Sequence, residues 1–215
     1  MKINHHLDDV TILAFAAGTL GEAHGIVAAS HISLCADCRA NLRAAESLGG
    51  GVLAGQQVEA VTDLCRAATL ASLDVALASK PAAVTKTELP PALFRALNGQ
   101  SLSDVKWKKK APGIAMFDVP MEKNSKTHLK LLSVAYGRAL PEHGHGGDEL
   151  TLVLKGSYND HMGHFAAGDV ADLDQDVEHQ PTVDSREDCV CVVAFEAPTK
   201  FKSIWARLAQ PFIGI

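Results

Sequence analysis

Two histidines and a glutamate in the C-terminal half of the chain constrain its fold more than any other feature. His143 and His145 are two residues apart, and Glu149 follows four residues later. Side chains two apart on an extended strand point to the same side of a sheet. The short Gly146-Gly147 turn lets the glutamate return to the same centre. The spacing therefore predicts a metal site on one face of a β-sheet.

The glycines around these ligands complete a longer pattern. Gly137-x5-His143-x-His145-x3-Glu149-x6-Gly156 resembles the first signature motif of the cupin family and matches it at each fixed position. Gly156 suits the tight turn into the next strand. The resemblance implies a jelly-roll barrel that binds a metal.

The second cupin motif is only partly present. Gly168-Asp169 and His179 are recognisable, but Asp176 stands where the family usually has glycine, and Val183 where it usually has asparagine. His179 still supplies a fourth ligand. Three imidazoles and one carboxylate accept zinc or another divalent transition metal. The expected ligands of this centre are His143, His145, Glu149 and His179.

The spacing of apolar residues changes along the chain, from a helical period in the first part to a period of two in the second. Helical patterns occupy the first eighty residues, at about 9–20, 22–31, 36–48 and 58–78, and Gly49–Gly51 is the expected end of the third. Strand patterns follow near 113–119, 128–136, 149–155, 168–173 and 189–195. Helices first and strands afterwards predict an α+β protein with separate domains. We expect a small helical zinc-binding domain at 1–80, a proline-bearing linker at 81–100 and a cupin domain at 101–215.

A second set of potential ligands lies among the helices. His31, Cys35 and Cys38 form an H-x3-C-x2-C pattern, whose offsets of zero, four and seven share one helix face. One imidazole and two thiolates are three of the four ligands that structural zinc prefers. The fourth is expected to be an upstream histidine, in order of preference His6, His5 or His24.

This domain resembles the zinc-binding anti-sigma domain, which binds bacterial sigma factors of the extracytoplasmic-function group. The segments HHLDDVTILAFAAGTL and HISLCADCRA, the glycines at 49–51 and the cupin that follows together resemble the ChrR type of anti-sigma factor. The resemblance covers nearly the whole chain. It implies Zn²⁺ held by His6, His31, Cys35 and Cys38.

The same resemblance implies a function in transcription regulation. We expect an anti-sigma factor that sequesters an extracytoplasmic-function sigma factor and releases it in an oxidative stress response, on a singlet-oxygen-type signal sensed through the cupin. The alternative is a metal-dependent cupin enzyme, such as a dioxygenase acting on a small molecule. The helical H-x3-C-x2-C domain favours the regulator, because a cupin enzyme alone does not need it. No catalytic residue is therefore assigned.

Charge and hydropathy limit the partners. The formal net charge is -5 without a long basic run, which argues against direct nucleic-acid binding. The longest apolar run, near 10–17, is far shorter than the ~20 residues that span a bilayer. We therefore expect a cytoplasmic protein that does not enter a membrane.

Three further cysteines lie outside the predicted zinc site. Cys189 and Cys191 are two apart in a strand pattern, so both thiols are expected to face one way. They are interpreted either as small core residues or as a pair that oxidises. Cys65 lies in an apolar helical stretch and is expected to be part of the core.

Overall fold

The computed structural model of the protein describes residues 2–76, 87–123 and 125–201. Two compact units are present: one formed by residues 1–46 together with 87–215, and one formed by residues 47–86. Within the described ranges, no helix is long and apolar enough to cross a membrane. The predicted boundaries at residues 80 and 100 stay a prediction.

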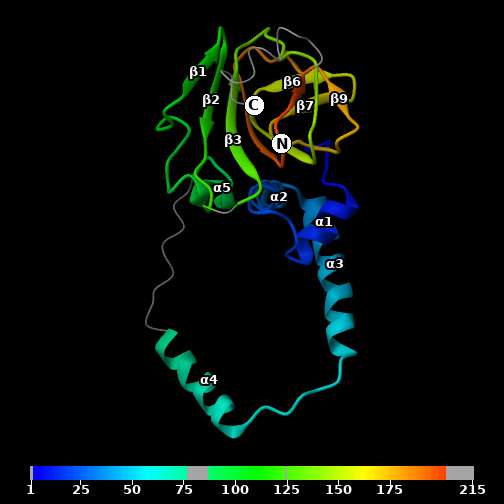
Figure 1. Ribbon diagram of the computed structural model, residues 1–215, viewed down its shortest axis with the longest axis vertical. Helices are drawn as coiled ribbons and strands as arrows, with labels where there is room; N and C mark the ends of the chain where they lie inside the picture. The colour runs from blue at the N-terminus through cyan, green and yellow to red at the C-terminus, as the bar shows by residue number, and fades with distance from the viewer. Residues whose placement is uncertain (1, 77–86, 124, 202–215) are drawn as a thin grey trace. The chain divides into compact units, whose positions relative to one another are not determined.

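Five helices lie in the described part of the chain, where the sequence predicts four before residue 80. Their bounds are α1 Asp9–Ala16, α2 Glu22–Leu34, α3 Ala36–Ala54, α4 Asp63–Ala76 and α5 Pro91–Ala96. Asp8 caps α1, since its side chain accepts a hydrogen bond from the Thr11 amide. The short helix α5, inside the range predicted as a linker, lies beside α2 (Figure 1).

The expected end of the third helix is wrong, because α3 continues through Gly49–Gly51 to Ala54. A glycine ends a helix by adopting a positive φ, and none of these three does so. Glycine inside a helix costs only about 1 kcal/mol relative to alanine, so the helix continues. The expected core position of Cys65 is also wrong, since this residue is exposed on α4.

The strands form an antiparallel barrel of three sheets. The large sheet has the order β1-β2-β3-β11-β5-β8, and two smaller sheets have the orders β10-β6-β7 and β12-β4-β9. All five predicted strand segments are present. The bounds are β1 Lys108–Ala111, β2 Ile114–Asp118, β3 His128–Val134, β4 His143–Gly144, β5 Glu149–Lys155, β6 Ser157–Asp160, β7 Gly163–Ala166, β8 Val170–Leu173, β9 Glu178–His179, β10 Thr182–Val183, β11 Cys189–Phe195 and β12 Lys200–Phe201.

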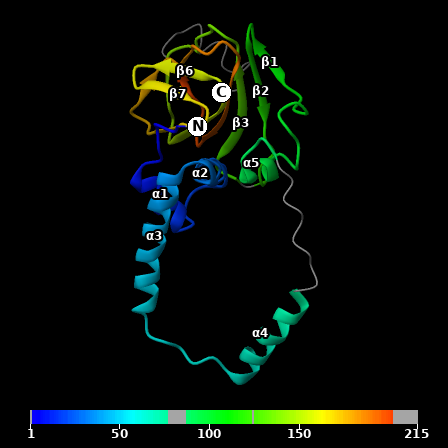
Figure 2. The same cartoon turned by 180° about the vertical axis from the view of Figure 1, so that it is seen from behind.

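Alternation along the central strand β11 separates two hydrophobic cores. Val192 and Ala194 belong to the core that includes Val27 of α2. Cys191 and Val193 belong to the second core, in the barrel interior. The N-terminal helices therefore cover the outer face of the large sheet, which explains why β5 and β11 are buried on both faces. Figure 2 shows α2 at one end of the barrel, close to β3. The architecture is α+β, helices followed by a jelly-roll barrel, as the sequence predicts.

Candidate metal centres

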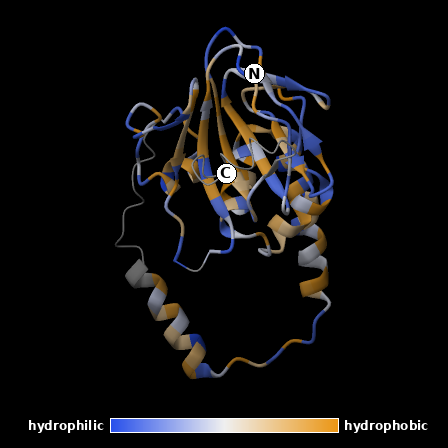
Figure 3. Ribbon diagram, turned by 45° about the horizontal axis from the view of Figure 1, so that its top comes forward, coloured by the Kyte–Doolittle hydropathy of each residue, from blue (hydrophilic) through white to orange (hydrophobic). Residues whose placement is uncertain are grey.

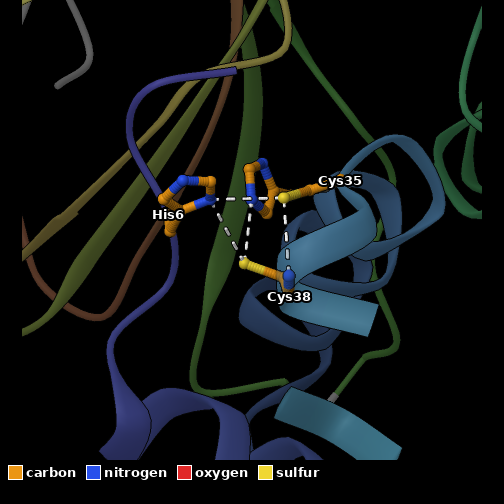
Figure 4. Close-up of side chains that lie close together, drawn as sticks. His6, Cys35 and Cys38 are labelled. Atoms are coloured by element: carbon orange, nitrogen blue, oxygen red, sulfur yellow. Dashed lines mark hydrogen bonds between the residues drawn. The ribbon is translucent and has the colours of Figure 1, made fainter. Parts of the chain in front are cut away.

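The first candidate centre lies where α2 ends and α3 begins. His31 is in the last turn of α2, Cys35 separates the two helices, and Cys38 is in the first turn of α3. His6 reaches them from the extended segment that precedes α1 (Figure 4). One ligand atom from each of these four residues lies within 4.8 Å of all the others.

The distances in this cluster suit a tetrahedral metal. The His6 Nδ1 atom is 3.2 Å from the Cys35 Sγ atom and 3.8 Å from the Cys38 Sγ atom. The His31 Nε2 atom is 3.2 Å from the Cys38 Sγ atom. Tetrahedral zinc, with its usual bonds to sulfur and nitrogen, separates ligand atoms by about 3.3–3.8 Å. These three separations are therefore close to those between the ligands of a tetrahedral zinc ion.

The other two candidate histidines lie elsewhere. His5 stacks on Phe165 with ring centroids 3.9 Å apart, and its Nε2 atom is 3.1 Å from the His164 carbonyl oxygen. The Nε2 atom of His24 is 3.1 Å from the carbonyl oxygen of Asp148. Of the three upstream histidines, the structure thus brings only His6 to the cluster.

Burial prepares the ligands of this cluster differently. Burial lowers the pKa of His31 to about 4, so its imidazole is neutral and able to bind a metal at physiological pH. Burial, helped by the neighbouring Cys35, raises the pKa of the Cys38 thiol to about 11. A metal would therefore have to displace a proton from Cys38, as metal binding to thiols generally does.

The barrel supplies hydrogen-bond partners to this centre. The Nδ1 atom of His31 is 2.9 Å from the Gly168 carbonyl oxygen, so it donates there and leaves Nε2 for the cluster. Asp169, which is fully buried, accepts hydrogen bonds from the backbone amides of Asn4 at 2.6 Å and His5 at 3.0 Å. We call the contact between residues 4–8 and residues 168–172 the seam.

The second candidate centre lies inside the barrel. The three histidines of this centre are His143 on β4, His179 on β9, and His145, which follows β4 directly. One ring nitrogen of each lies within 4.8 Å of a ring nitrogen of the other two. The Nε2 atoms of His143 and His179 are 3.1 Å apart. The Nε2 atom of His145 is buried and has no hydrogen-bond partner. A buried ring nitrogen without a hydrogen-bond partner, beside two other imidazoles, is suited to bind a metal ion.

Each of these imidazoles is oriented by a partner at its other nitrogen. The Nδ1 atom of His143 lies 2.8 Å from the Pro141 carbonyl oxygen, and that of His179 lies 2.9 Å from the buried Asp160 carboxylate. Such outer partners are typical of metal-ligating histidines, because they fix the tautomer and the ring orientation. Burial lowers the pKa of both His143 and His179, which keeps them neutral.

Glu149 lies beside the three histidines rather than among them. Its Oε2 atom is 3.1 Å from the Nδ1 atom of His145, and Thr151 donates to its Oε1 atom at 3.0 Å. Burial favours the protonated acid, but the hydrogen bond and charge of His145 outweigh it and lower the pKa of Glu149 below its ordinary value. The carboxylate is therefore ionised and adjacent to the predicted ligand set.

Sequence reasoning missed two carboxylates with structural roles at these centres. Asp160 orients His179 from 19 positions earlier in the chain, without a spacing signal. Asp169 holds the segment that carries His6, and its only signal in the sequence is its place in the second cupin motif.

The thiols of Cys189 and Cys191 face the same side of β11, as predicted, with Sγ atoms 3.7 Å apart.

Comparisons with known proteins agree with this architecture. The family model described as the ChrR cupin-like domain matches residues 98–198. The chain is 37% identical over 216 residues to the anti-sigma-E factor ChrR of Cereibacter sphaeroides, and the match covers all of both chains. It also matches a crystal structure of Rhodobacter sphaeroides SigE in complex with the anti-sigma ChrR. That match has 34% identity and a TM-score of 0.75, and it covers 90% of this chain and 99% of that one.

Proposed function

Because this chain belongs to the ChrR family of anti-sigma factors, we propose that it sequesters an extracytoplasmic-function sigma factor and releases it on an oxidative signal. The related ChrR was crystallised with SigE, which supports a sigma factor as the partner here. Sigma factors act with RNA polymerase, so the proposal assigns the chain to the cytoplasm. It also assigns sigma binding to residues 1–80, with 81–100 as the linker and 101–215 as the sensing cupin.

The observation that carries the sigma-binding proposal is a set of exposed apolar side chains in the unit 47–86. Of the twelve large apolar residues exposed in the described ranges, eight fall between residues 48 and 73. Figure 3 shows such apolar positions along α4. We call this set the 48–73 surface: Leu48, Val52, Leu53, Val58, Val61, Leu64, Leu70 and Leu73.

So many exposed apolar side chains indicate that the 48–73 surface binds another protein. Leu64 on α4 is 85% exposed and Val58 is 92% exposed. Fully burying one such side chain contributes about 1.5–3 kcal/mol, so several together provide the energy of a specific complex. An amphipathic helix with an exposed apolar face is a common element of protein recognition.

We assign Zn²⁺ to the first centre. Two thiols and two imidazoles whose ligand atoms lie within 4.8 Å of one another are a donor set that suits structural zinc better than harder metals. When bound, zinc would crosslink the segment before α1 to the junction of α2 and α3. Bound zinc contributes roughly 10–16 kcal/mol of apparent binding energy in small zinc domains, enough to order helices as short as α1.

For the second centre we propose His143, His145, Glu149 and His179 as the ligands of Zn²⁺ or another divalent transition metal. The unpaired Nε2 atom of His145 and the outer partners of the other two imidazoles support a metal there. Glu149 would complete the set by turning from its contact with the Nδ1 atom of His145.

The seam offers a route from the barrel to the first centre. Asp169 immediately precedes β8, and β8 pairs with β5, where Leu173 is opposite Glu149. A change in β5 or in the second centre would shift β8 and, through Asp169, the segment that carries His6. The sensing proposal requires only that oxidation stabilises the sigma-free arrangement by a few kcal/mol.

The thiols of Cys189 and Cys191 are the chemical groups we assign to the response, together with the metal ligands. Both residues lie on β11, the strand next to β5, and their sulfurs are in contact. An oxidant such as singlet oxygen would take two electrons and two protons from the two thiols, which forms a disulfide and hydrogen peroxide. The sulfurs must then approach from 3.7 Å to about 2 Å. That approach would distort β11 and the strand beside it.

The sigma-binding proposal is tested by affinity capture of an extracytoplasmic-function sigma factor from the source organism on the full-length chain. Leu64→Asp puts a charge into the 48–73 surface and is expected to weaken binding at least about 30-fold. Tyr136→Asp is the matched control, because Tyr136 is 63% exposed but lies on the barrel unit. If both variants capture the sigma factor like the unmodified chain, the 48–73 surface is not the docking site.

A further inference from the structure

Hydrogen bonds hold helix α2 to the barrel at both of its ends. At the first turn, the Ala23 amide donates to the Thr127 hydroxyl at 3.1 Å, which caps the helix because the N-cap residue Gly21 has no side chain to do so. At the last turn, the Nδ1 atom of His31 donates to the Gly168 carbonyl oxygen at 2.9 Å. Between these ends, α2 shares a hydrophobic core with strand β5. The position of α2 is therefore fixed relative to the barrel wall.

A further hydrogen bond joins α2 to the second centre. The Nε2 atom of His24, which is only 4% exposed, donates to the Asp148 carbonyl oxygen at 3.1 Å. Asp148 is the last residue of the short turn, with glycines at 146–147, that leads from His145 to Glu149. Glycine has the widest backbone freedom, so such a turn is held in one shape by its contacts rather than by its own backbone. His24 thus fixes the backbone between two proposed ligands of the second centre.

The same helix carries a proposed ligand of the first centre. His24 and His31 are seven residues apart on α2, which corresponds to about 10 Å along the helix axis. A metal bound to His31 would fix the last turn of α2, and the hydrogen bonds along the helix would then keep His24 in place. This connection runs through a helix and is distinct from the seam, which depends on Asp169.

We propose that His24 is a positioning residue through which each metal centre favours occupancy of the other. A metal in the first centre holds α2, and His24 then holds the turn at Asp148, so the ligands on either side of that turn are ready for a second metal. By linkage, a metal in the second centre strengthens binding at the first by the same factor. The inference rests on the two metal centres proposed above, and it does not depend on sigma binding.

The test fills the two centres of the full-length chain with different ions. One equivalent of Cd²⁺, a soft ion, binds the two thiolates of the first centre, and cadmium NMR shows that sulfur holds it. Mn²⁺, a hard ion that avoids thiolates, is then titrated into the second centre. The electron paramagnetic resonance signal of free Mn²⁺ gives its dissociation constant. The same titration of the metal-free full-length chain gives the affinity without a metal in the first centre.

Three variants assign the effect to His24. His24→Leu keeps a side chain of similar size but donates no hydrogen bond. His24→Gln restores the donor, because its amide nitrogen lies near the position of the histidine Nε2 atom. Ser30→Ala is the control, since Ser30 is also buried on α2 but its hydroxyl donates within the helix, to the Ile26 carbonyl oxygen at 2.7 Å.

Cd²⁺ is expected to raise the Mn²⁺ affinity of the unmodified chain about 5-fold, the value of one hydrogen bond. His24→Gln and Ser30→Ala should keep this gain, and His24→Leu should reduce it to less than about 2-fold. Equal Mn²⁺ affinity with and without Cd²⁺ in the unmodified chain would overturn the proposal even if no variant folds, and so would the full gain in His24→Leu. If Mn²⁺ binds neither form, the second centre is wrong and the inference falls with it, whereas binding without coupling refutes the inference alone.

Discussion

Asp169 is the residue through which the barrel is expected to control the first metal centre. Its Oδ1 atom accepts hydrogen bonds from the amides of Asn4 and His5, and its Oδ2 atom accepts one from Ala166 at 2.9 Å. The next residue after His5 is the ligand His6. Asp169→Ala removes all three bonds and leaves three backbone amides without partners.

The size of the effect follows from those bonds. Hydrogen bonds to a charged acceptor contribute about 1.5–3 kcal/mol each when buried, but these three are only partly buried, so water can replace part of this contribution. We therefore expect Asp169→Ala to lower the free energy of unfolding by roughly 2–4 kcal/mol. Loss of a partner of a ligand side chain typically lowers metal affinity by about 10- to 100-fold. Asp169 fixes the backbone beside His6 rather than a ligand side chain, so we expect a fall at the lower end of this range, about 10-fold.

Asp169→Asn distinguishes the effect of the negative charge from that of the hydrogen bonds to Asn4 and His5. Its amide oxygen can still accept from Asn4 and His5, so only the charge and the bond to Ala166 are lost. We expect about 1 kcal/mol of destabilisation and a smaller fall in zinc affinity. Asp172→Asn is the matched control, since Asp172 accepts hydrogen bonds from the Asp8 amide and the Thr11 side chain, and an asparagine oxygen can accept from the Asp8 amide too.

The assay is competition for zinc with a coloured chelator on the full-length proteins, combined with hydrogen exchange of residues 2–10. Asp169→Ala should release the first zinc equivalent at lower chelator concentration and lose protection in this segment, whereas Asp172→Asn should do neither. An Asp169→Ala protein that holds the zinc of the first centre as tightly as the unmodified chain would refute the argument that the barrel supports this centre.

Three further predictions concern the metals and pH. Cys35→Ala should lose one metal equivalent and helical circular dichroism, and unchanged zinc content by elemental analysis would contradict the first site. His143→Ala combined with His145→Ala should lose the other equivalent and keep the first; retention of both equivalents would refute the second. Burial, followed by the charge of Asp8, raises the pKa of Asp172 from 3.8, so its stabilising contribution is present below that pH and is lost as pH rises. Asp172→Asn should therefore increase the urea midpoint at pH 7 and match the unmodified chain near pH 3; a lower midpoint at pH 7 would contradict this.

Local patterns predicted most of the fold. Period-two alternation located strands such as β5 and β11, and the aspartate before α1 marked its start. The end of α3 was missed because three glycines were interpreted as a stop, although a helical glycine is only weakly unfavourable. The short helix α5 was missed because its two prolines were assigned to a linker, whereas proline suits the first turn of a helix.

The ligand atoms follow from spacing, but their surroundings do not. His31, Cys35 and Cys38 share a helical pattern, and His143 and His145 share a strand, so each group is visible in the sequence. The bonds from Asp169 to residues 4 and 5 join positions about 165 apart, and such contacts arise only when the whole fold forms. For the same reason, the sequence could only rank the upstream histidines, with His6 before His5 and His24, and the family resemblance then implied His6.

The seam also bears on how the two halves work together. The helices α1 and α2 share a hydrophobic core with the outer face of the large sheet, rather than standing apart from the barrel. A barrel that is packed against the first centre can influence that centre directly, without a signal through the linker. This arrangement supports an inhibitor whose zinc site responds to the state of its cupin.

Transcription from a promoter that depends on the captured sigma factor tests the central claim most directly, measured before and after photosensitised singlet oxygen. Cells with the unmodified chain should show low transcription that rises after exposure. Cells with His143→Ala, or with Cys189→Ala combined with Cys191→Ala, should show low transcription that stays low, because the sigma factor is bound but not released. Normal induction in both barrel variants would contradict sensing by the cupin, and high transcription before exposure with the unmodified chain would contradict sequestration itself.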